Sequence, residues 1–138
     1  MMARALMVVV LWVGLLAAVS LAALPAFDTT RLYSQAAFAA AIKPYTDAVA
    51  QNANDAEAHY WLGVAYLHGA RLFRFGLAPY AREFAARAVA SLERAVRLRA
   101  DPRTLMALLE AYVIVGDRQK SEAIFTRLGT LAQPIPLK

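Results

Sequence analysis

The sequence predicts an all-α protein in which an N-terminal transmembrane or signal helix precedes a short solenoid of helical hairpins. Three observations predict this class. A long apolar run without charges stands near the start of the chain. Alternating runs of β-branched residues are scarce after residue 30, which argues against strands. Residues of matching type also recur at spacings of 33 to 47 positions, which is typical of stacked helical arrays.

The apolar run extends from Ala5 to Phe27, which is 23 residues without a charged side chain. As a helix rising about 1.5 Å per residue it would reach about 34 Å, enough to cross a hydrocarbon core about 30 Å thick. We therefore expect residues 1–27 to form a transmembrane signal anchor and residues 28–138 to form the helical domain. Two alternatives stay open: a secretory signal that is cleaved at the small residues near position 20, and a helix buried in a core.

The charges around the apolar run predict its orientation. Arg4 and the free amino group precede the run and Asp28 follows it, so the positive-inside rule places the N-terminus in the cytoplasm. Arg31 and Lys43 on the far side weaken this bias. We expect a single-pass membrane protein with its C-terminal domain in the periplasm or at the surface of a bacterial cell, or a secreted protein if the signal is cleaved.

Residues of matching type recur in the part of the chain that follows the run. The trio Leu62, Gly63 and Tyr66 returns 46 residues later as Leu108, Leu109 and Tyr112. A second pattern, a small residue, then a large one, then mostly a small one, occurs three times: Ala41, Tyr45 and Ala48; Ala88, Leu92 and Ala95; and Ser121, Phe125 and Leu128.

These patterns resemble the tetratricopeptide repeat family over about residues 36–134. In that family a Leu-Gly pair and a Tyr mark the first helix of each hairpin, a small–aromatic–small pattern marks the second, and a proline such as Pro102 follows. The resemblance implies a solenoid of about two and a half repeats that binds other proteins. Leu109 departs from it, because the family has glycine at that position.

Gly63 calls for a physical reason, since a glycine inside a helix costs about 1 kcal/mol relative to alanine. We expect the second helix of the hairpin, which carries the small residues Ala88 and Ala95, to press closely against Gly63. Leu62 and Tyr66 would then fill the space between the helices.

The first hairpin carries an insertion of 13 residues, because Tyr66 and Ala88 are 22 residues apart and the matching pair in the next hairpin is 9 apart. We expect the insertion to lengthen both helices by about two turns, with residues 73–78 as the connection inside an extended hairpin at 67–87. Pro79 suits the first position of the second helix.

Proline, glycine and aspartate residues predict the remaining helix boundaries. Turns are expected at Asp101-Pro102 and at Gly116-Asp117. Pro44 is expected to kink or restart a helix that begins near Asp28.

No catalytic or metal-binding pattern is legible in the sequence. The absence of cysteine excludes disulfides, cysteine-based zinc sites and iron–sulfur clusters. His59 and His68 fall on opposite faces of one helix at about 100° per residue, so they cannot share a metal ion. We expect no enzymatic activity, no cofactor and no small-molecule substrate.

Two surfaces are candidates for binding a partner protein. The first is an apolar groove on the concave face, for which the candidates are Tyr60, Val64, Arg103, Met106 and Ile114. The set of Lys, Asn and Arg with which some family members grip a terminal carboxylate is absent there.

The second is the basic and aromatic insertion, for which the candidates are Arg71, Phe73, Arg74, Phe75, Tyr80, Arg82 and Phe84. Arginine and aromatic residues are enriched at interfaces with proteins and at membrane headgroups. The alternative is a solvated basic face whose aromatics only pack the longer hairpin. Nucleic acid is not expected as a partner outside the cytoplasm.

Together these features predict a non-catalytic interaction scaffold that serves as an accessory subunit of a multi-subunit membrane complex. The alternative is a stand-alone module, tethered or secreted, that binds client proteins or peptides. Fewer than three repeats favours the subunit, because a partner would cover an open end of the solenoid.

Overall fold

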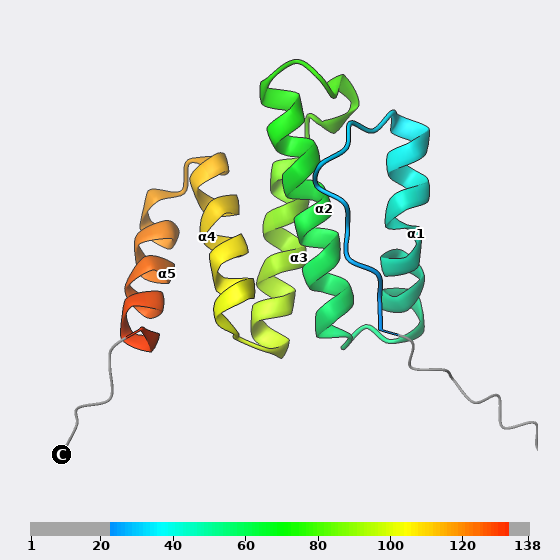
Figure 1. Ribbon diagram of the computed structural model, residues 1–138. Coiled ribbons are helices and arrows are strands. Elements are labelled where there is room, and N and C mark those ends of the chain that lie inside the picture. The colour runs from blue at the N-terminus through cyan, green and yellow to red at the C-terminus, as the bar shows by residue number, and fades with distance from the viewer. Residues whose placement is uncertain (1–22, 133–138) are drawn as a thin grey trace, which may run out of the picture.

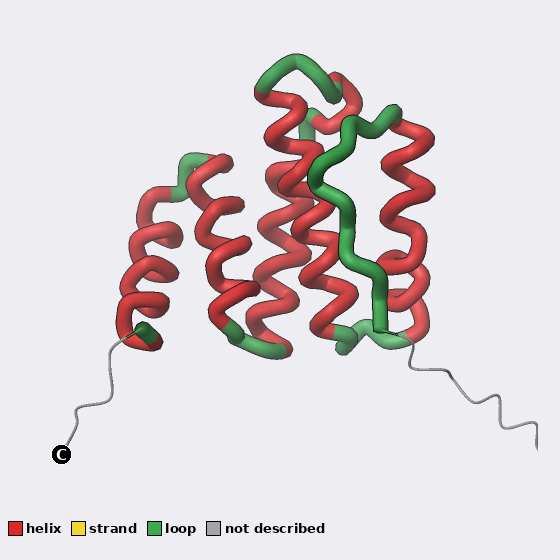
Figure 2. Tube along the Cα trace, in the orientation of Figure 1, coloured by secondary structure: helices red, strands yellow, loops and turns green. Residues whose placement is uncertain are grey.

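The computed structural model describes residues 23–132, and in that part of the chain all regular structure is helical (Figures 1 and 2). The elements are α1 (Gln35–Gln51), α2 (Ala56–Arg74), the short 3-10 helix η1 (Pro79–Ala81), α3 (Phe84–Leu98), α4 (Pro102–Val115) and α5 (Arg118–Leu131). Each helix packs against the next, in a row that runs from α1 to α5 (Figure 1). The all-α prediction is confirmed for these residues. No helix among them is long and apolar enough to cross a membrane.

Local chemistry sets most of the helix starts. The side chains of Ser34, Asp55, Asp101 and Asp117 each accept a hydrogen bond from a backbone N–H in the first turn of the following helix, and such a cap is worth about 1 kcal/mol. Gly116 ends α4 with a φ of 77°, which glycine adopts without strain. The turns predicted at Asp101-Pro102 and Gly116-Asp117 are therefore confirmed.

Gly63 lies where α2 and α3 approach each other most closely. A Cβ atom at this position would stand 2.3 Å from Cγ of Leu92, so a side chain there would overlap α3. The predicted close contact is confirmed, with Leu92 as the residue that presses on Gly63. Ala88 and Ala95 flank Leu92 and are completely buried, as the spacing of small residues requires.

The first hairpin differs from its prediction. α2 has 19 residues and is the longest helix of the described chain, but α3 begins only at Phe84 and has 15 residues, one more than α4 or α5. Only the first helix is lengthened, and the connection runs over residues 75–83. Gly76, with a φ of 73°, turns the chain after α2, and Pro79 starts η1 instead of α3.

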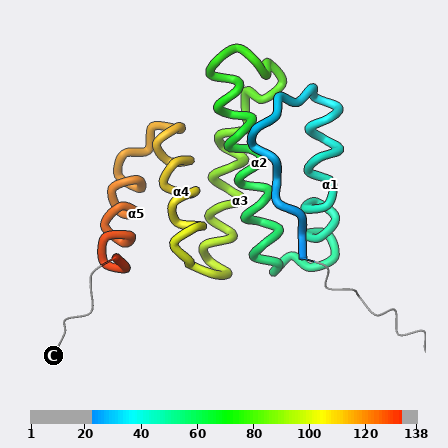
Figure 3. Tube along the Cα trace, in the orientation of Figure 1, coloured from blue at the N-terminus to red at the C-terminus, as the bar shows by residue number. Residues whose placement is uncertain are grey.

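A second difference lies at the start of the domain. α1 begins at Gln35, not near Asp28, and continues through Pro44 without a restart. Residues 23–34, which we call the strap, form no helix and run alongside α1 and α2 (blue in Figures 1 and 3). The segment 23–27 of the expected membrane helix is thus extended, and residues 1–22 of that helix lie outside the described residues.

Buried side chains and hydrogen bonds hold the strap in place. Phe27 and Tyr33 are both buried, and their rings stack with centroids 5.1 Å apart. Tyr45 in α1 donates its hydroxyl to the carbonyl oxygen of Pro25 at 2.7 Å. Nε2 of His68 in α2 lies 2.7 Å from the carbonyl oxygen of Arg31. The folded domain therefore begins several residues before the boundary that the sequence predicts.

Candidate functional site

A groove lies between α2 and α4, and its walls are one stripe of side chains from each helix. Spacings of three and four residues place these side chains on a single face of each helix. We call it the α2–α4 groove. It is lined by Tyr60, Val64, Leu67 and Arg71 of α2 and by Arg103, Met106, Ala107, Leu109, Glu110 and Val113 of α4.

Four of the five groove candidates come together here, namely Tyr60, Val64, Arg103 and Met106. Ile114 does not line the groove. It is one position past Val113 and packs against both buried hydrophobic clusters.

A cluster of charges bridges the two helices at one end of the groove. Glu57 accepts hydrogen bonds from Nη2 of Arg99 at 2.8 Å and from Nη2 of Arg103 at 2.7 Å. The bond from Arg103 holds the pKa of Glu57 below its ordinary value. The Arg103 guanidinium also lies over the ring of Tyr60, 3.9 Å from its centroid. Glu57 is therefore the carboxylate that joins both arginines at this end of the groove, and Asp101 also binds Arg99.

An ion pair bridges the helices at the other end. Arg71 of α2 binds both carboxylate oxygens of Glu110 in α4, with 2.8 Å between Nη2 and Oε2. The sequence placed Arg71 at the tip of the inserted hairpin. Because it follows Leu67 by four residues, it belongs instead to the groove stripe.

The floor between the two charged ends is apolar. Val64 and Ala107 are partly buried and Met106 is largely exposed, and Val113, about one turn past Glu110 on α4, is 62% exposed. An apolar floor with charges at both ends suits an extended or helical protein segment whose central side chains are apolar.

The groove is continuous with a hollow between α4 and α5. Leu109 and Val113 line both, and Phe125 of α5 stands at the edge with 69% of its surface exposed. Leu92, which matches Phe125 in the repeat pattern, is completely buried. Leu109 stands where the first hairpin has Gly63, so the second hairpin lacks the space that receives Leu92, and α5 buries none of its side chains fully.

The tip candidates divide into two groups. Arg74, Phe75 and Arg82 are exposed, with Phe75 at 78%. Phe73 and Tyr80 are partly buried against the first core cluster, and Phe84 is buried within it. The alternative in which the aromatics pack the longer hairpin thus describes three of the four.

Two further exposed apolar residues, Leu32 in the strap and Leu77 in the connection, were not singled out from the sequence. Each stands alone among polar or turn-forming residues, so no periodic signal marked it.

The two histidines have separate structural roles. Nε2 of His59 lies 2.9 Å from the carbonyl oxygen of Ala53, and His68 is buried beneath the strap. Within residues 23–132 no cluster of three or more His, Cys, Asp or Glu could hold a metal ion.

Comparison of this chain with protein-family models, with curated protein sequences and with solved structures found no match in any of the three. The α2–α4 groove is therefore the basis on which a function is proposed.

Proposed function

We propose that this chain is a non-catalytic protein–protein interaction scaffold that holds an apolar segment of another protein in the α2–α4 groove. One observation carries the proposal: a preformed apolar floor, partly open to solvent, lies between two ion pairs that fix the separation of α2 and α4. A preformed groove binds with little loss of conformational entropy, because its walls need not be ordered first.

The resemblance to tetratricopeptide repeats supports the proposal. Two consecutive helical hairpins, α2–α3 and α4–α5, place matching residues at matching steps of the array, and the groove lies between the first helices of the two hairpins. The ion pairs at the two ends, Arg103 with Glu57 and Arg71 with Glu110, favour a segment that is polar at its ends and apolar in its centre.

We further propose that the chain is an accessory subunit of a membrane complex, anchored by its apolar N-terminal run and with its helical domain outside the cytoplasm. The exposed apolar residues at the α4–α5 end, Val113 and Phe125, support a stable partner there, because such residues lower solubility when they stay uncovered. The stand-alone module that binds clients remains the alternative, since the groove by itself accommodates a passing segment.

Site-specific photo-cross-linking in cells tests the scaffold. A benzophenone amino acid at Val113 should give a discrete adduct with a partner protein. The same amino acid at Ala36, which is exposed on α1, serves as the matched control and should give none. Met106→Glu should abolish the Val113 adduct, because it places a charge on the apolar floor.

Sizing in mild detergent then separates the two versions of the proposal. A large stable particle supports the subunit, and a transient adduct on an otherwise single chain supports the module. Equal labelling from Val113 and Ala36, or a Val113 adduct that persists with Met106→Glu, would overturn the groove as the binding site.

A further inference from the structure

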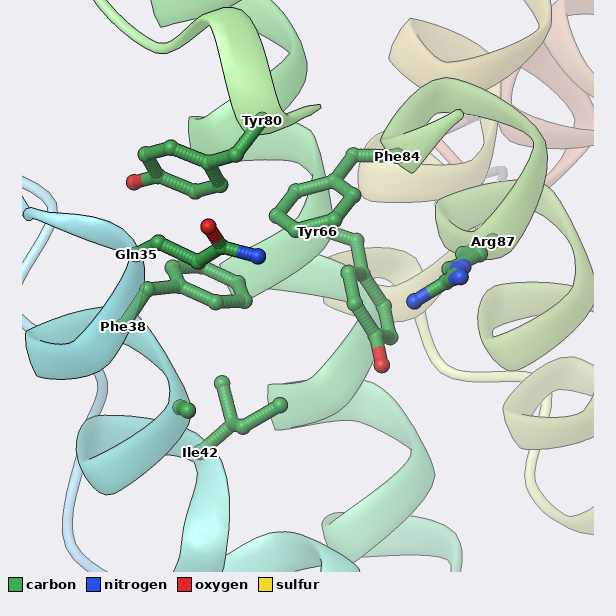
Figure 4. A pocket seen from close by; sticks show the side chains of 8 residues that line it. Gln35, Phe38, Ile42, Tyr66, Tyr80, Phe84 and Arg87 are labelled. Atoms are coloured by element: carbon green, nitrogen blue, oxygen red, sulfur yellow. The ribbon is translucent and has the colours of Figure 1, made fainter. Parts of the chain in front are cut away.

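A second cavity, separate from the α2–α4 groove, lies where α1, α2, η1 and α3 meet (Figure 4). We call it the aromatic cavity. Its volume is about 250 Å³, and it is lined by Gln35, Phe38, Ala39, Ile42, Tyr66, Tyr80, Phe84 and Arg87. Tyr66 is its only residue from α2 and lies on a different face of that helix from the groove stripe, which includes Val64 and Leu67.

Four aromatic rings form one side of the aromatic cavity. The Phe84 ring is central, with centroid distances of 4.8 Å to Phe38, 5.1 Å to Tyr66 and 5.8 Å to Tyr80 (Figure 4). Gly69 makes room for it, because a Cβ atom there would stand 2.4 Å from the Phe84 ring. These contacts fix the rings without any bound molecule.

The strap fixes one more wall. The hydroxyl of Tyr80 donates a hydrogen bond to the carbonyl oxygen of Tyr33 at 2.7 Å, which sets the orientation of the Tyr80 ring. The aromatic side of the cavity is thus preorganised, as binding sites for small groups usually are.

Arg87 and Gln35 stand at the solvent-exposed rim of the cavity, where a ligand could reach them. The Arg87 guanidinium lies over the rings of Tyr66 and Phe84, 5.9 and 5.7 Å from their centroids. No carboxylate of residues 23–132 forms an ion pair with Arg87. The Tyr66 hydroxyl and the Gln35 amide also lack side-chain hydrogen bonds among these residues.

We propose that the aromatic cavity binds a planar apolar ring that carries a carboxylate, with the ring against Phe38, Tyr66 and Phe84 and the carboxylate on Arg87. An apolar cavity of about 150 Å³ is sufficient for benzene. The larger cavity here leaves room for the carboxylate and one or two waters. Arginine presents a planar fork that matches a carboxylate with two parallel hydrogen bonds.

The fixed positive charge decides against the other ligand that aromatic cavities favour. Cages of aromatic rings bind quaternary ammonium groups through cation–π attraction. Arg87 already places a positive charge 5.9 and 5.7 Å from the ring centroids of Tyr66 and Phe84 and would repel a second cation. The same ring-and-carboxylate chemistry is offered by a free aromatic acid and by the C-terminal aromatic residue of a protein.

Binding of phenylacetate to the full-length protein in detergent tests the proposal, with neutral phenylacetamide as the matched probe and saturation-transfer NMR as the readout. We expect phenylacetate to bind about tenfold more tightly than the amide, as one charge-assisted hydrogen-bonding contact provides. Arg87→Gln should remove this preference. Ala39→Phe should fill the cavity and abolish binding of both probes. Arg82→Gln, an exposed arginine outside the cavity, should change neither, and circular dichroism should show all variants folded.

Two short peptides that end in phenylalanine, one with a free and one with an amidated C-terminus, distinguish the sources. Binding of the free peptide alone supports a protein C-terminus as the ligand, and binding of phenylacetate without the peptide supports a small aromatic acid. The proposal is overturned if phenylacetate shows no saturable binding below about 10 mM. It is equally overturned if Arg87→Gln and Ala39→Phe bind the acid as the wild type does.

Discussion

At the scale of single residues, the spacing between the helices depends on which side chain stands at one repeated position. Gly63 allows the Leu92 side chain to pack against the backbone of α2, whereas α4 has Leu109 at the matching position and Phe125 is exposed. The difference between glycine and leucine at this one position thus accompanies tight packing of α2 against α3 and looser packing of α4 against α5. The sequence shows both residues, and the close contact at Gly63 was predictable because a helical glycine needs a compensating contact.

Gly63→Ala should destabilise the protein by about 1–3 kcal/mol, because the added methyl group must displace the buried Leu92 side chain. This loss exceeds the gain of about 1 kcal/mol that alanine brings to a helix interior. Urea unfolding of the full chain in detergent measures the difference.

Gly129→Ala in α5 is the matched control for Gly63→Ala, since a Cβ atom there meets nothing within 4 Å. It should leave stability unchanged or raise it by up to about 1 kcal/mol. Equal shifts for the two variants would mean that Gly63 is not held against α3.

Glu57 makes the stability of the groove depend on pH. Because Arg103 and Arg99 stabilise its ionised form, its folded-state pKa lies below the unfolded value near 4.5. The contribution is fully present above pH 4.5 and is lost as pH falls through the lower, folded-state pKa. Glu57→Gln should therefore lower stability by about 1 kcal/mol or less at pH 7, as for a partly exposed ion pair.

The gap between wild type and Glu57→Gln should narrow below pH 4.5 and vanish at the acid end of the unfolding series. Asp28, whose pKa is also lowered, is not hydrogen-bonded to Arg99 or Arg103 and cancels in the comparison. Asp101 shares Arg99 with Glu57 and does not cancel, so the double variant with Asp101→Asn serves as the control. A gap that stays constant with pH would show that the carboxylate charge is not what matters at position 57.

At the scale of elements, α3 and α5 occupy matching places in consecutive hairpins but are held differently. α3 is amphipathic and buries Ala88, Leu92 and Ala95 between α2 and α4, and Phe84 against α1, α2 and η1. α5 packs mainly on α4, reaches α3 through the ion pair of Lys120 with Glu93, and has no helix on its far side in the described chain (Figure 1). Its stability therefore comes mainly from its cap at Asp117 and from contacts along one face.

Alanine at the two matching positions should give very different results. Leu92→Ala should cost about 2–5 kcal/mol, as removal of a buried leucine side chain does. Phe125→Ala should cost about 0.5 kcal/mol or less, because the ring is mostly exposed. Denaturant midpoints of the two variants give the comparison, and a large loss from Phe125→Ala would mean that α5 packs more tightly than its exposure indicates.

Helix boundaries could be predicted where neighbouring residues determine them, and not where residues distant in sequence do. The ends of α4 and the start of α5 follow from Asp101, Pro102 and Gly116, whose effects act within one turn. The start of α3 was not predictable in the same way, because Pro79 can begin either an α-helix or a 3-10 helix. Tyr80, which follows Pro79 in η1, donates a hydrogen bond to Tyr33, 47 residues away in sequence, and such a long-range contact cannot be read from local residues.

The candidate site was predictable to a similar extent. Helical spacing alone brings Tyr60, Val64 and Met106 to one groove, since these positions repeat with the period of the helix. It could not assign Arg71, which pairs across to Glu110, because the sequence does not show which helix lies opposite. The aromatic cavity was missed for the same reason, as its lining comes from four separate elements.

At the scale of the whole molecule, the array has unequal ends. The strap covers part of α1 and α2 through the buried rings of Phe27 and Tyr33 (Figure 1), whereas the α4–α5 end presents exposed apolar side chains. Local opening should follow this asymmetry, since segments with few buried contacts open at the lowest free energy.

Hydrogen exchange should show the gradient directly. Backbone amides in the middle of α2 should exchange slowest, and those of α5 should exchange fastest among the helices, by at least about tenfold relative to α3. Mass spectrometry of peptides from the exchanged protein resolves the helices separately. Protection of α5 equal to that of α3 in the purified chain would contradict the open end, whereas protection gained only inside a larger particle would identify α5 as the covered surface.

The strap also limits how copies of this chain can join. A repeat array can grow when the last hairpin of one molecule packs against the first hairpin of the next, and such head-to-tail contacts build a filament when the rotation between copies does not close a ring. The strap lies against the first two helices at the N-terminal end, contacting α1 through Tyr45 and α2 through His68 (Figure 1). A further helix that docked on this face would have to displace the strap, so the strap hinders growth of such a filament from this end.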